Sequence, residues 1–303
     1  MLDVRRLRLL RELAHLGTIA AVAQTLAYSP SAVSQQLAAL EREAGVPLLA
    51  RSGRRVTLTP AGATLAGYAE SVLALLEEAS AALAASRRGL SGPLAIGAFP
   101  TAVRTILPAA LVRLGRDHPQ LELAVTEIDP ADVPGAIRAG GLDVALVHDY
   151  DHVPIEPDPA LDTEPLAVET IYLATQGPPA DLAGDPIRGC RDAPWIVASP
   201  GTLCHTMALR ACQAAGFSPR VRHHADDFAA VLALVATGQG VALVPELGAA
   251  GPPPDVTLTA LRTQRRTRIA YRKGTARHPA VAEFRAAIHE SAAAYLGLRA
   301  PQP

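Results

Sequence analysis

The sequence predicts an α/β protein in three consecutive parts: an N-terminal winged helix-turn-helix, a long linker helix, and a C-terminal two-lobed α/β domain. Three observations carry this prediction. Capped helical segments and an arginine-rich hairpin occupy residues 1–59. A helical stretch of unusual length follows them. Strands then alternate with helices through the rest of the chain, which is typical of sheets with crossover connections.

Two helices are expected at the start of the chain, over residues 3–16 and 18–26. Gly17 ends the first, and Thr18 can cap the second by accepting a backbone N–H of its first turn. The second helix is rich in alanine, which lets two helices cross closely. With the short turn 27–28 and the helix after it, this segment suits a helix-turn-helix. An alanine-rich helical hairpin inside an ordinary core is the alternative.

Residues 29–43 predict the helix around which the head is built. The Ser29 hydroxyl can cap it, and Pro30 suits its first position because the missing N–H needs no partner there. One face is apolar at helical spacing, and the opposite face is short or mostly neutral-polar. The residues of that opposite face are Ser31, Ser34, Gln35, Ala38 and Arg42. Serine and glutamine can hydrogen-bond base edges or phosphates, so we expect DNA contacts here; an ordinary polar helix surface is the alternative.

Residues 46–58 predict a hairpin, the wing, whose tip is basic. Its second half is rich in β-branched residues, which favour a strand. The arginines clustered at its tip are Arg51, Arg54 and Arg55. Such arginines can lie against phosphates or enter a narrow minor groove. We assign them, together with Thr18, to phosphate or minor-groove contact; a solvated basic hairpin is the alternative.

The charge of the chain is distributed unevenly. Residues 1–60 hold eight arginines against four acidic residues, a net charge of +4 in a chain whose total is −1. The other 243 residues therefore carry −5. A small basic head on an acidic body fits a head that faces nucleic acid. The 303 residues are 49% hydrophobic, enough for the cores of two or more domains.

Residues 60–88 predict the longest helix of the chain. Thr59 and Pro60 repeat the cap-plus-proline start. The apolar positions then step by three and four, as in a heptad seam. They are Leu65, Tyr68, Val72, Leu75, Leu76, Ala79 and Leu83. A small head cannot bury this seam alone, so we expect a second copy of the chain, with two recognition helices at least about one DNA turn apart.

The remaining residues predict two α/β lobes. The expected strands are 94–98, 121–127, 143–147, 166–174, 195–198, 221–224, 241–244 and 269–271, and the expected helices are 100–116, 131–140, 203–215, 228–237 and 279–296. This alternation indicates parallel sheets with crossovers. We expect a DNA-binding domain at 1–59, a linker helix at 60–88 and a ligand-binding body at 89–303. Lobe I would span about 93–161 and 266–303, and lobe II about 162–265.

The head also carries a set of residues that together resemble a known family. They are Leu7, Gly17, Thr18, 21–26, 29–34, Leu40, Glu41, Gly45, Pro47, Leu48, Arg51, 56–59, Ala61 and Gly62. With them, residues 3–62 resemble the winged helix-turn-helix of LysR-type transcriptional regulators. The family usually has Phe where Leu49 stands, which is a small departure in the packing of the wing.

The resemblance continues weakly to about residue 297. It implies a periplasmic-binding-protein-like effector domain and a homodimer or homotetramer. As partners it implies double-stranded promoter DNA, a small-molecule effector and RNA polymerase. A bound effector would shift the two lobes, and with them the spacing of the recognition helices and the bending of the promoter.

Ligands of open α/β sheets bind beyond the carboxyl ends of the strands, which selects the loops after each strand. In lobe I these loops hold Phe99, Pro100, Thr101, His148 and Asp149. In lobe II they hold Ser199, Gly201 and Thr202. A helix N-terminus favours an anion, because its free N–H groups and dipole point there. We hypothesise that Thr202, with Thr101, holds an anionic group of the effector; simple helix capping by both threonines is the alternative.

Neither a metal nor another cofactor is expected. Residues 223–227 read HHADD, which resembles a ligand cluster, but adjacent strand residues point to opposite faces and rarely converge on one ion. Cys204 and Cys212 lie eight residues apart on a predicted helix, roughly 12 Å along its axis, farther than the Cα separation of about 7 Å that a disulfide permits. Because two cysteines of this region form a disulfide in peroxide-sensing members of the family, a redox-responsive regulator through Cys204 and Cys212 stays open.

We therefore expect a sequence-specific DNA-binding transcriptional regulator without catalytic residues. A two-lobed solute-binding protein or enzyme is the rival, but it leaves the basic wing and the long helix unexplained. The first eleven residues are charged rather than apolar, and no apolar run has membrane-spanning length. Three cysteines make no disulfide framework. We expect a cytoplasmic protein with no membrane partner.

Overall fold

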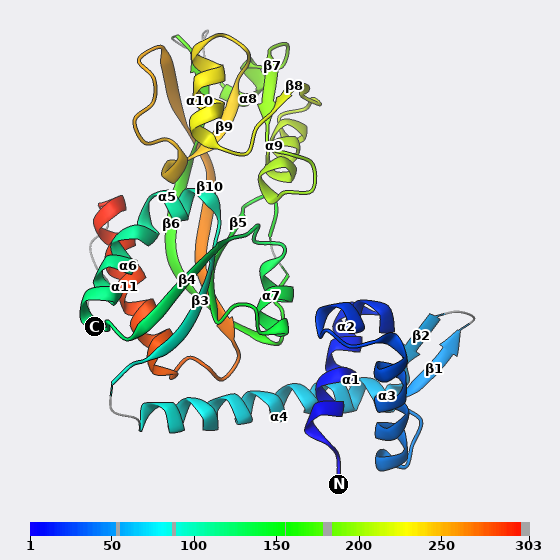
Figure 1. The fold of residues 1–303 in the computed structure, drawn as a ribbon. Helices are drawn as coiled ribbons and strands as arrows, with labels where there is room; N and C mark the ends of the chain where they lie inside the picture. Colours follow the sequence, from blue (N-terminus) through cyan, green and yellow to red (C-terminus); the bar gives the residue numbers. More distant parts are fainter. Residues whose placement is uncertain (53–54, 87–88, 155, 178–183, 298–303) are drawn as a thin grey trace.

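The computed structural model describes residues 1–52, 55–86, 89–154, 156–177 and 184–297. A small helical head, one long helix and a two-lobed body follow one another along the chain (Figure 1). The long helix runs from the head to the base of the body, and the two lobes are stacked above it. Within the described residues, none of the helices is both long and apolar enough to cross a bilayer.

Three helices and a two-stranded wing make the head: α1 (Val4–Leu16), α2 (Ile19–Thr25), α3 (Pro30–Ala44), β1 (Leu49–Ser52) and β2 (Arg55–Leu58). The caps expected from the sequence form. Thr18 Oγ1 accepts the Ala21 N–H at 3.1 Å, and Ser29 Oγ accepts the Ala32 N–H at 3.2 Å. The apolar faces of the three helices pack into one core around Leu10, Val33 and Leu40.

The base of the wing is fixed to the helices on both of its sides. Glu41 Oε1, on α3, accepts the N–H groups of Leu48 and Leu49 at 2.9 and 3.0 Å. The helix α4 (Pro60–Ala85) begins directly behind the wing. Its Gly62 is so close to Leu48 that a Cβ there would lie 2.1 Å from the Leu48 carbonyl oxygen. The wing therefore keeps its position relative to the recognition helix.

A six-stranded sheet with the order β4-β3-β5-β10-β6-β9 forms the centre of the body. Its strands are β3 (Gly92–Ala98), β4 (Leu121–Glu127), β5 (Val144–Tyr150), β6 (Leu161–Gln176), β9 (Ala242–Pro245) and β10 (Val256–Arg272). The parallel sheet with crossovers expected from the sequence is present only in part. β3 pairs in parallel with β4 and β5, but β10 returns antiparallel to both β5 and β6, so the sheet is mixed.

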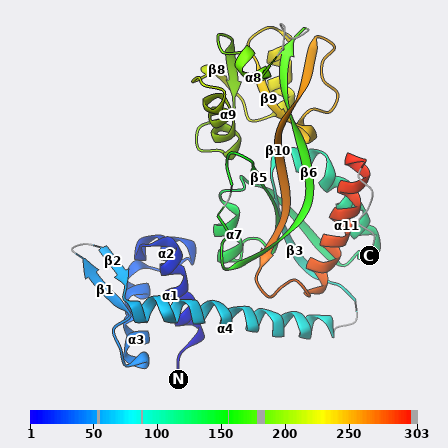
Figure 2. The same ribbon diagram turned by 180° about the vertical axis from the view of Figure 1, so that it is seen from behind.

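The strands β6 and β10 extend through both lobes, as the two ribbons in Figure 2 show. The apolar pattern of the sequence predicts short strands at 166–174 and 269–271 and a lobe boundary near 161 and 266. Instead the two strands pair from Leu161↔Arg272 to Gln176↔Val256. The passage between the lobes lies inside both strands, near the register shift between Ala260 and Gln264. The length of β10 was not predictable from the sequence, because its polar residues interrupt the apolar run that is typical of a buried strand.

Helices cover the sheet and give each lobe its own core. The helices of lobe I are α5 (Pro100–Arg104), α6 (Ile106–Asp117), α7 (Val133–Ala139) and α11 (Pro279–Leu296). The helices of lobe II are α8 (Pro186–Gly189), α9 (Leu203–Ala214) and α10 (Phe228–Ala236). Lobe II also contains the strands β7 (Pro194–Val197) and β8 (Arg220–His224) and a 3-10 turn at Glu246–Gly248. The helix expected over 100–116 is interrupted at Thr105, whose hydroxyl donates to the Thr101 carbonyl at 2.6 Å.

Buried charges join the head to lobe I. Glu12 of α1 is fully buried, and its carboxylate accepts from the neighbouring Arg11 at 2.5 Å and from Arg138 of α7 at 3.2 Å. Arg138 also pairs with Asp158. Arg8 donates to the Arg138 carbonyl at 2.9 Å. The head is thus fixed against α7, the helix of lobe I that lies nearest to it in both views (Figures 1 and 2).

Candidate functional site

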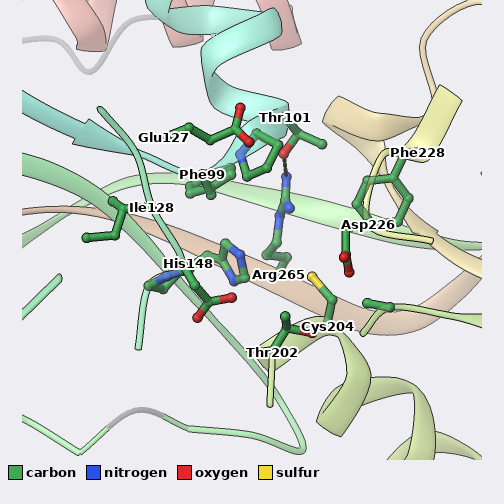
Figure 3. A pocket seen from close by; sticks show the side chains of 14 residues that line it. Phe99, Thr101, Glu127, Ile128, His148, Thr202, Cys204, Asp226, Phe228 and Arg265 are labelled. Carbon is green, nitrogen blue, oxygen red and sulfur yellow. Dashed lines mark hydrogen bonds between the residues drawn. The ribbon is translucent and has the colours of Figure 1, made fainter. Parts of the chain in front are cut away.

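A cavity of about 190 Å³ lies between the two lobes, where the loops after β3 and β4 meet the start of α9. Figure 3 shows its side chains converging from both lobes. The lining residues are Phe99, Pro100, Thr101, Glu127, Ile128, Asp129, Pro130, His148, Ala198, Thr202, Cys204, Asp226, Phe228 and Arg265. The volume is below the range of about 300–1,000 Å³ usual for drug-sized ligands, so a small metabolite fits it.

Arg265 of β10 forms one wall of the cavity and is 1% exposed. Its guanidinium forms a bidentate pair with Glu169 of β6, with N–O distances of 3.0 and 2.8 Å. A third bond runs from Nη2 to the Thr101 hydroxyl at 3.2 Å, the dashed line in Figure 3. Glu169 also accepts the Leu247 N–H and the Thr267 hydroxyl. Burial lowers the pKa of Arg265, but the Glu169 charge outweighs it, so the guanidinium stays protonated.

His148 of β5 lies at the centre of the cavity wall and is 2% exposed. Its ring packs edge-on against Phe99 and Tyr150, with centroid distances of 4.7 and 5.1 Å. Burial, and secondarily the charge of Arg265, lowers the pKa of His148 well below 6.5, so the ring is neutral. Among the described residues, no group hydrogen-bonds its Nδ1.

Five of the eight residues predicted for the cleft line this cavity: Phe99, Pro100, Thr101, His148 and Thr202. The other three do not. Asp149 follows His148 in β5 and pairs with Arg266 and Arg268 instead. Ser199 donates its hydroxyl to Asp226 at 2.6 Å, and Gly201 lies outside the lining. Alternation along a strand explains why neighbours such as His148 and Asp149 point to opposite faces.

The surroundings of Thr202 do not favour the anionic effector expected from the sequence. The Thr202 hydroxyl accepts the His205 N–H at 3.2 Å and donates to the Ser199 carbonyl at 2.9 Å, so it already acts as the cap of α9. Asp129, from the other lobe, lies against the Leu203 N–H, which partly offsets the rise that burial causes in its pKa. An anionic ligand near the start of α9 would therefore meet the protein's own Asp129 carboxylate in the cavity wall.

The sequence does not predict that one cleft brings together four further residues, which are Arg265, Glu169, Asp226 and Cys204. One signal was available for Glu169, because it is the only charged residue in the otherwise uncharged stretch 165–176. A single charge in such a strand indicates a buried partner. Arg265 gave no such signal, since it is one of several arginines in β10.

The residues predicted to contact DNA lie on one helical hairpin and the wing. Thr18, Ser31, Ser34 and Gln35 are exposed, and the hydroxyls of Ser29 and Ser31 are 3.0 Å apart. Arg51 and Arg55 belong to the paired strands of the wing, and Arg54 lies outside the described residues. The outer face of α3 is therefore open to a partner, as a recognition helix requires.

The seam predicted on α4 is only partly covered within one chain. Leu65 packs against the head core, but Tyr68, Leu75 and Leu83 are 68%, 63% and 72% exposed. Val72 and Leu76 are exposed as well. An apolar stripe of this kind marks an interaction surface, because monomers rarely leave one open to water.

Within the described ranges, no three His, Cys, Asp or Glu side chains are placed to hold a metal ion. His223 and His224 lie on β8 at the outer edge of lobe II, and Asp226 and Asp227 accept hydrogen bonds from Ser199 and Arg104. Both carboxylates therefore have hydrogen-bond partners within the described protein.

Together, the head with an open recognition helix and the body with an interlobe cavity define a class: DNA-binding proteins that respond to a small ligand. Comparison with known proteins gives the family. The model described as "Bacterial regulatory helix-turn-helix protein, lysR family" matches residues 4–63, and that described as "LysR substrate binding domain" matches residues 87–293. The chain belongs to the LysR family of bacterial transcriptional regulators, and it is a DNA-binding regulator with an effector-binding domain.

Curated relatives include a probable hydrogen peroxide-inducible genes activator from Mycobacterium avium, which is 34% identical over 74% of this chain and 71% of its own length. The transcriptional activator IlvY of Salmonella typhimurium is 30% identical over 81% of this chain and 83% of its own. Among solved structures, a hydrogen-peroxide-bound OxyR mutant from Corynebacterium glutamicum is 27% identical, with a TM-score of 0.57 and coverage of 100% and 98%. The LysR-family regulator CbnR is 25% identical, with a TM-score of 0.52 and coverage of 95% and 100%.

Proposed function

We propose that this regulator binds promoter DNA as a dimer, or a pair of dimers, and that a small effector in the interlobe cavity changes this binding. The exposed apolar stripe on α4 is the observation that supports the dimer. The cavity between two lobes through which β6 and β10 both run supports an effector-driven change in lobe orientation. The proposal keeps the three parts predicted from the sequence, a DNA-binding domain at 1–59, a linker helix at 60–88 and a ligand-binding body at 89–303. It places the boundary between the two lobes inside β6 and β10.

In this proposal the chain catalyses no reaction and works in the cytoplasm, where the chromosome and RNA polymerase are. The named relatives that support it are transcriptional regulators. A direct contact with RNA polymerase stays a prediction. The carboxylates that line the cavity do not favour an anionic effector.

The head is proposed to divide its DNA contacts between base edges and phosphates. Gln35→Ala should lose discrimination at one or two base pairs, at a cost of about 1–3 kcal/mol on the preferred site, because an exposed glutamine can pair with adenine. Arg54→Ala should weaken binding to all sequences alike and reduce the salt slope by about 1. Fluorescence anisotropy with the DNA upstream of the coding region, titrated with salt, measures both. The proposed division between base and phosphate contacts would be wrong if Arg54→Ala changed the sequence preference and Gln35→Ala weakened binding to all sequences alike.

A second candidate, a redox-responsive regulator, has one observation in its favour. Cys204 lines the cavity, and its Sγ lies 3.1 Å from the Tyr150 hydroxyl, close to Arg265. Two observations oppose a disulfide switch. Burial raises the pKa of the Cys204 thiol, so the reactive thiolate is disfavoured. Burial likewise raises the pKa of Cys212 to about 12, and both cysteines lie on the intact helix α9.

Cys204→Ser separates the two candidates. We expect the wild type and this variant to bind the upstream DNA equally before and after a pulse of hydrogen peroxide, because a thiol whose pKa is raised forms little of the reactive thiolate. Anisotropy of labelled DNA measures binding, and mass spectrometry follows the oxidation state of the cysteines. Cys190→Ser serves as the control outside the cavity. A peroxide-induced change in DNA binding that Cys204→Ser abolishes would establish the redox function instead.

A further inference from the structure

We propose that the cavity selects a small cationic ligand, a primary amine or amidine on a compact apolar body. This inference rests on the proposed effector function and names the chemical class of the effector. It is the opposite of the anionic ligand that the sequence suggested. Four features of the cavity support this inference. They are its excess of carboxylates, the Asp129 carboxylate near the start of α9, the buried His148 imidazole with an unpaired Nδ1, and the apolar side chains of the wall.

The charge of the cavity is negative. Three carboxylates line it, Glu127 and Asp129 from lobe I and Asp226 from lobe II. Among the described lining residues, Arg265 is the one cation, and its bidentate pair with Glu169 already neutralises it. Arg104, near the cleft, pairs with Asp227 at 2.8 Å. A carboxylate ligand would therefore meet like charges, whereas an ammonium would meet opposite ones.

Asp129 and Asp226 come from different lobes and line the same cavity. Burial raises the pKa of Asp129, and the charges of Asp132 and Asp226 add to this rise. Asp226 already accepts the Ser199 N–H and hydroxyl at 2.7 and 2.6 Å, which fixes the direction of its carboxylate. A cation between the two would relieve their repulsion. It would also draw the lobes together, since one carboxylate belongs to each.

His148 supplies an independent sign of a ligand. Its ring is more than nine-tenths buried, lines the same cavity, and has an Nδ1 without a hydrogen-bond partner among the described residues. Leaving a buried polar nitrogen without a hydrogen-bond partner is unfavourable. A neutral imidazole nitrogen accepts a hydrogen bond, and an ammonium group has three to donate. An amine can thus satisfy both the carboxylates and the imidazole.

The rest of the cavity wall is apolar, so it favours a ligand whose uncharged part is apolar as well. Phe99 and Ile128 come from lobe I, and Phe228 comes from lobe II (Figure 3). An aromatic or short aliphatic group can pack between them, while a strongly polar body would lose its hydration without compensation. A cavity of about 190 Å³ leaves room for a small amine rather than a polyamine or a nucleotide.

The test uses the full-length protein and three probes of one shape, 2-phenylethylamine, 2-phenylethanol and phenylacetate. Calorimetry and thermal unfolding should show the amine binding at least tenfold more tightly than the alcohol, and phenylacetate not stabilising the protein. Asp129→Asn and Asp226→Asn should each weaken amine binding at least tenfold and leave the alcohol unchanged. Glu122→Gln, on the same strand as Glu127 but roughly 17 Å from it, is the matched control.

A second measurement needs no ligand. Because burial, and after it the charges of Asp132 and Asp226, disfavour the charged form of Asp129, Asp129→Asn should raise the thermal unfolding temperature of the ligand-free protein, whereas Glu122→Gln should not. Tighter binding of phenylacetate than of the amine, amine binding that Asp226→Asn leaves unchanged, or no stabilisation by Asp129→Asn would each overturn the cationic class. The regulator function is judged separately, by binding of the wild type to its upstream DNA.

Discussion

Arg265→Ala lowers the free energy of unfolding by about 3–5 kcal/mol, because it leaves the Glu169 carboxylate charged, buried and without its main partner. The two residues come from the two strands that pass between the lobes, so their separation disturbs both lobes. The variant also loses the bond to Thr101 and the stacking of the guanidinium over Phe99 at 4.9 Å. Urea unfolding followed by tryptophan fluorescence measures the loss, because Trp195 is fully buried in lobe II.

Two further variants make this prediction specific. Arg262→Ala removes an exposed arginine of the same strand and should change the free energy of unfolding by less than about 0.5 kcal/mol. The double variant Arg265→Met, Glu169→Leu should regain most of the loss, since an apolar pair can replace a buried ion pair. An Arg265→Ala variant as stable as the wild type would show that the pair is not buried in solution.

Leu75→Glu abolishes dimer formation and weakens promoter binding by a factor of about 10²–10⁴, the range by which two linked sites exceed one. Leu75 is 63% exposed within one chain, so the substitution should leave the protomer folded. In the proposed dimer it would place two carboxylates in an apolar seam, where burying an unpaired charge is costly. Sedimentation velocity measures the assembly, and anisotropy measures DNA binding.

Leu75→Met is the matched control for this prediction. It keeps the volume and apolar character of the position, so the dimer and the DNA affinity should stay near those of the wild type. Circular dichroism of both variants tests whether the protomer is intact. A Leu75→Glu protein that still sediments as a dimer would place the interface elsewhere on the chain.

Local rules predicted the head well, because its signals lie within a few residues of one another. The caps at Thr18 and Ser29 depend on side chains that bond to backbone three residues away. The heptad spacing of α4 likewise lies within one helix, and the stripe is exposed as expected. The bounds of α3 differ from the expected 29–43 by one residue at each end.

The cavity could be predicted only in part, because its key contacts join distant segments. Arg265 and Glu169 are 96 residues apart, and Thr101 is 164 residues from Arg265. Nothing in the spacing of β10 distinguishes Arg265 from its neighbours. The loop rule for open sheets found Phe99, Thr101 and Thr202 because it depends on strand ends alone. It could not show that carboxylates from both lobes meet there.

The position of α7 has a mechanical consequence. This helix of seven residues, roughly 10 Å long, starts just after Asp129 and Pro130 in the cavity wall and ends beside Arg138, which pairs with Glu12 in the head. A ligand that displaces the wall must therefore either carry the helix along and tilt the head, or break a buried ion pair. In the proposed mechanism, α7 would therefore couple binding of the effector in the cavity to the orientation of the DNA-binding head.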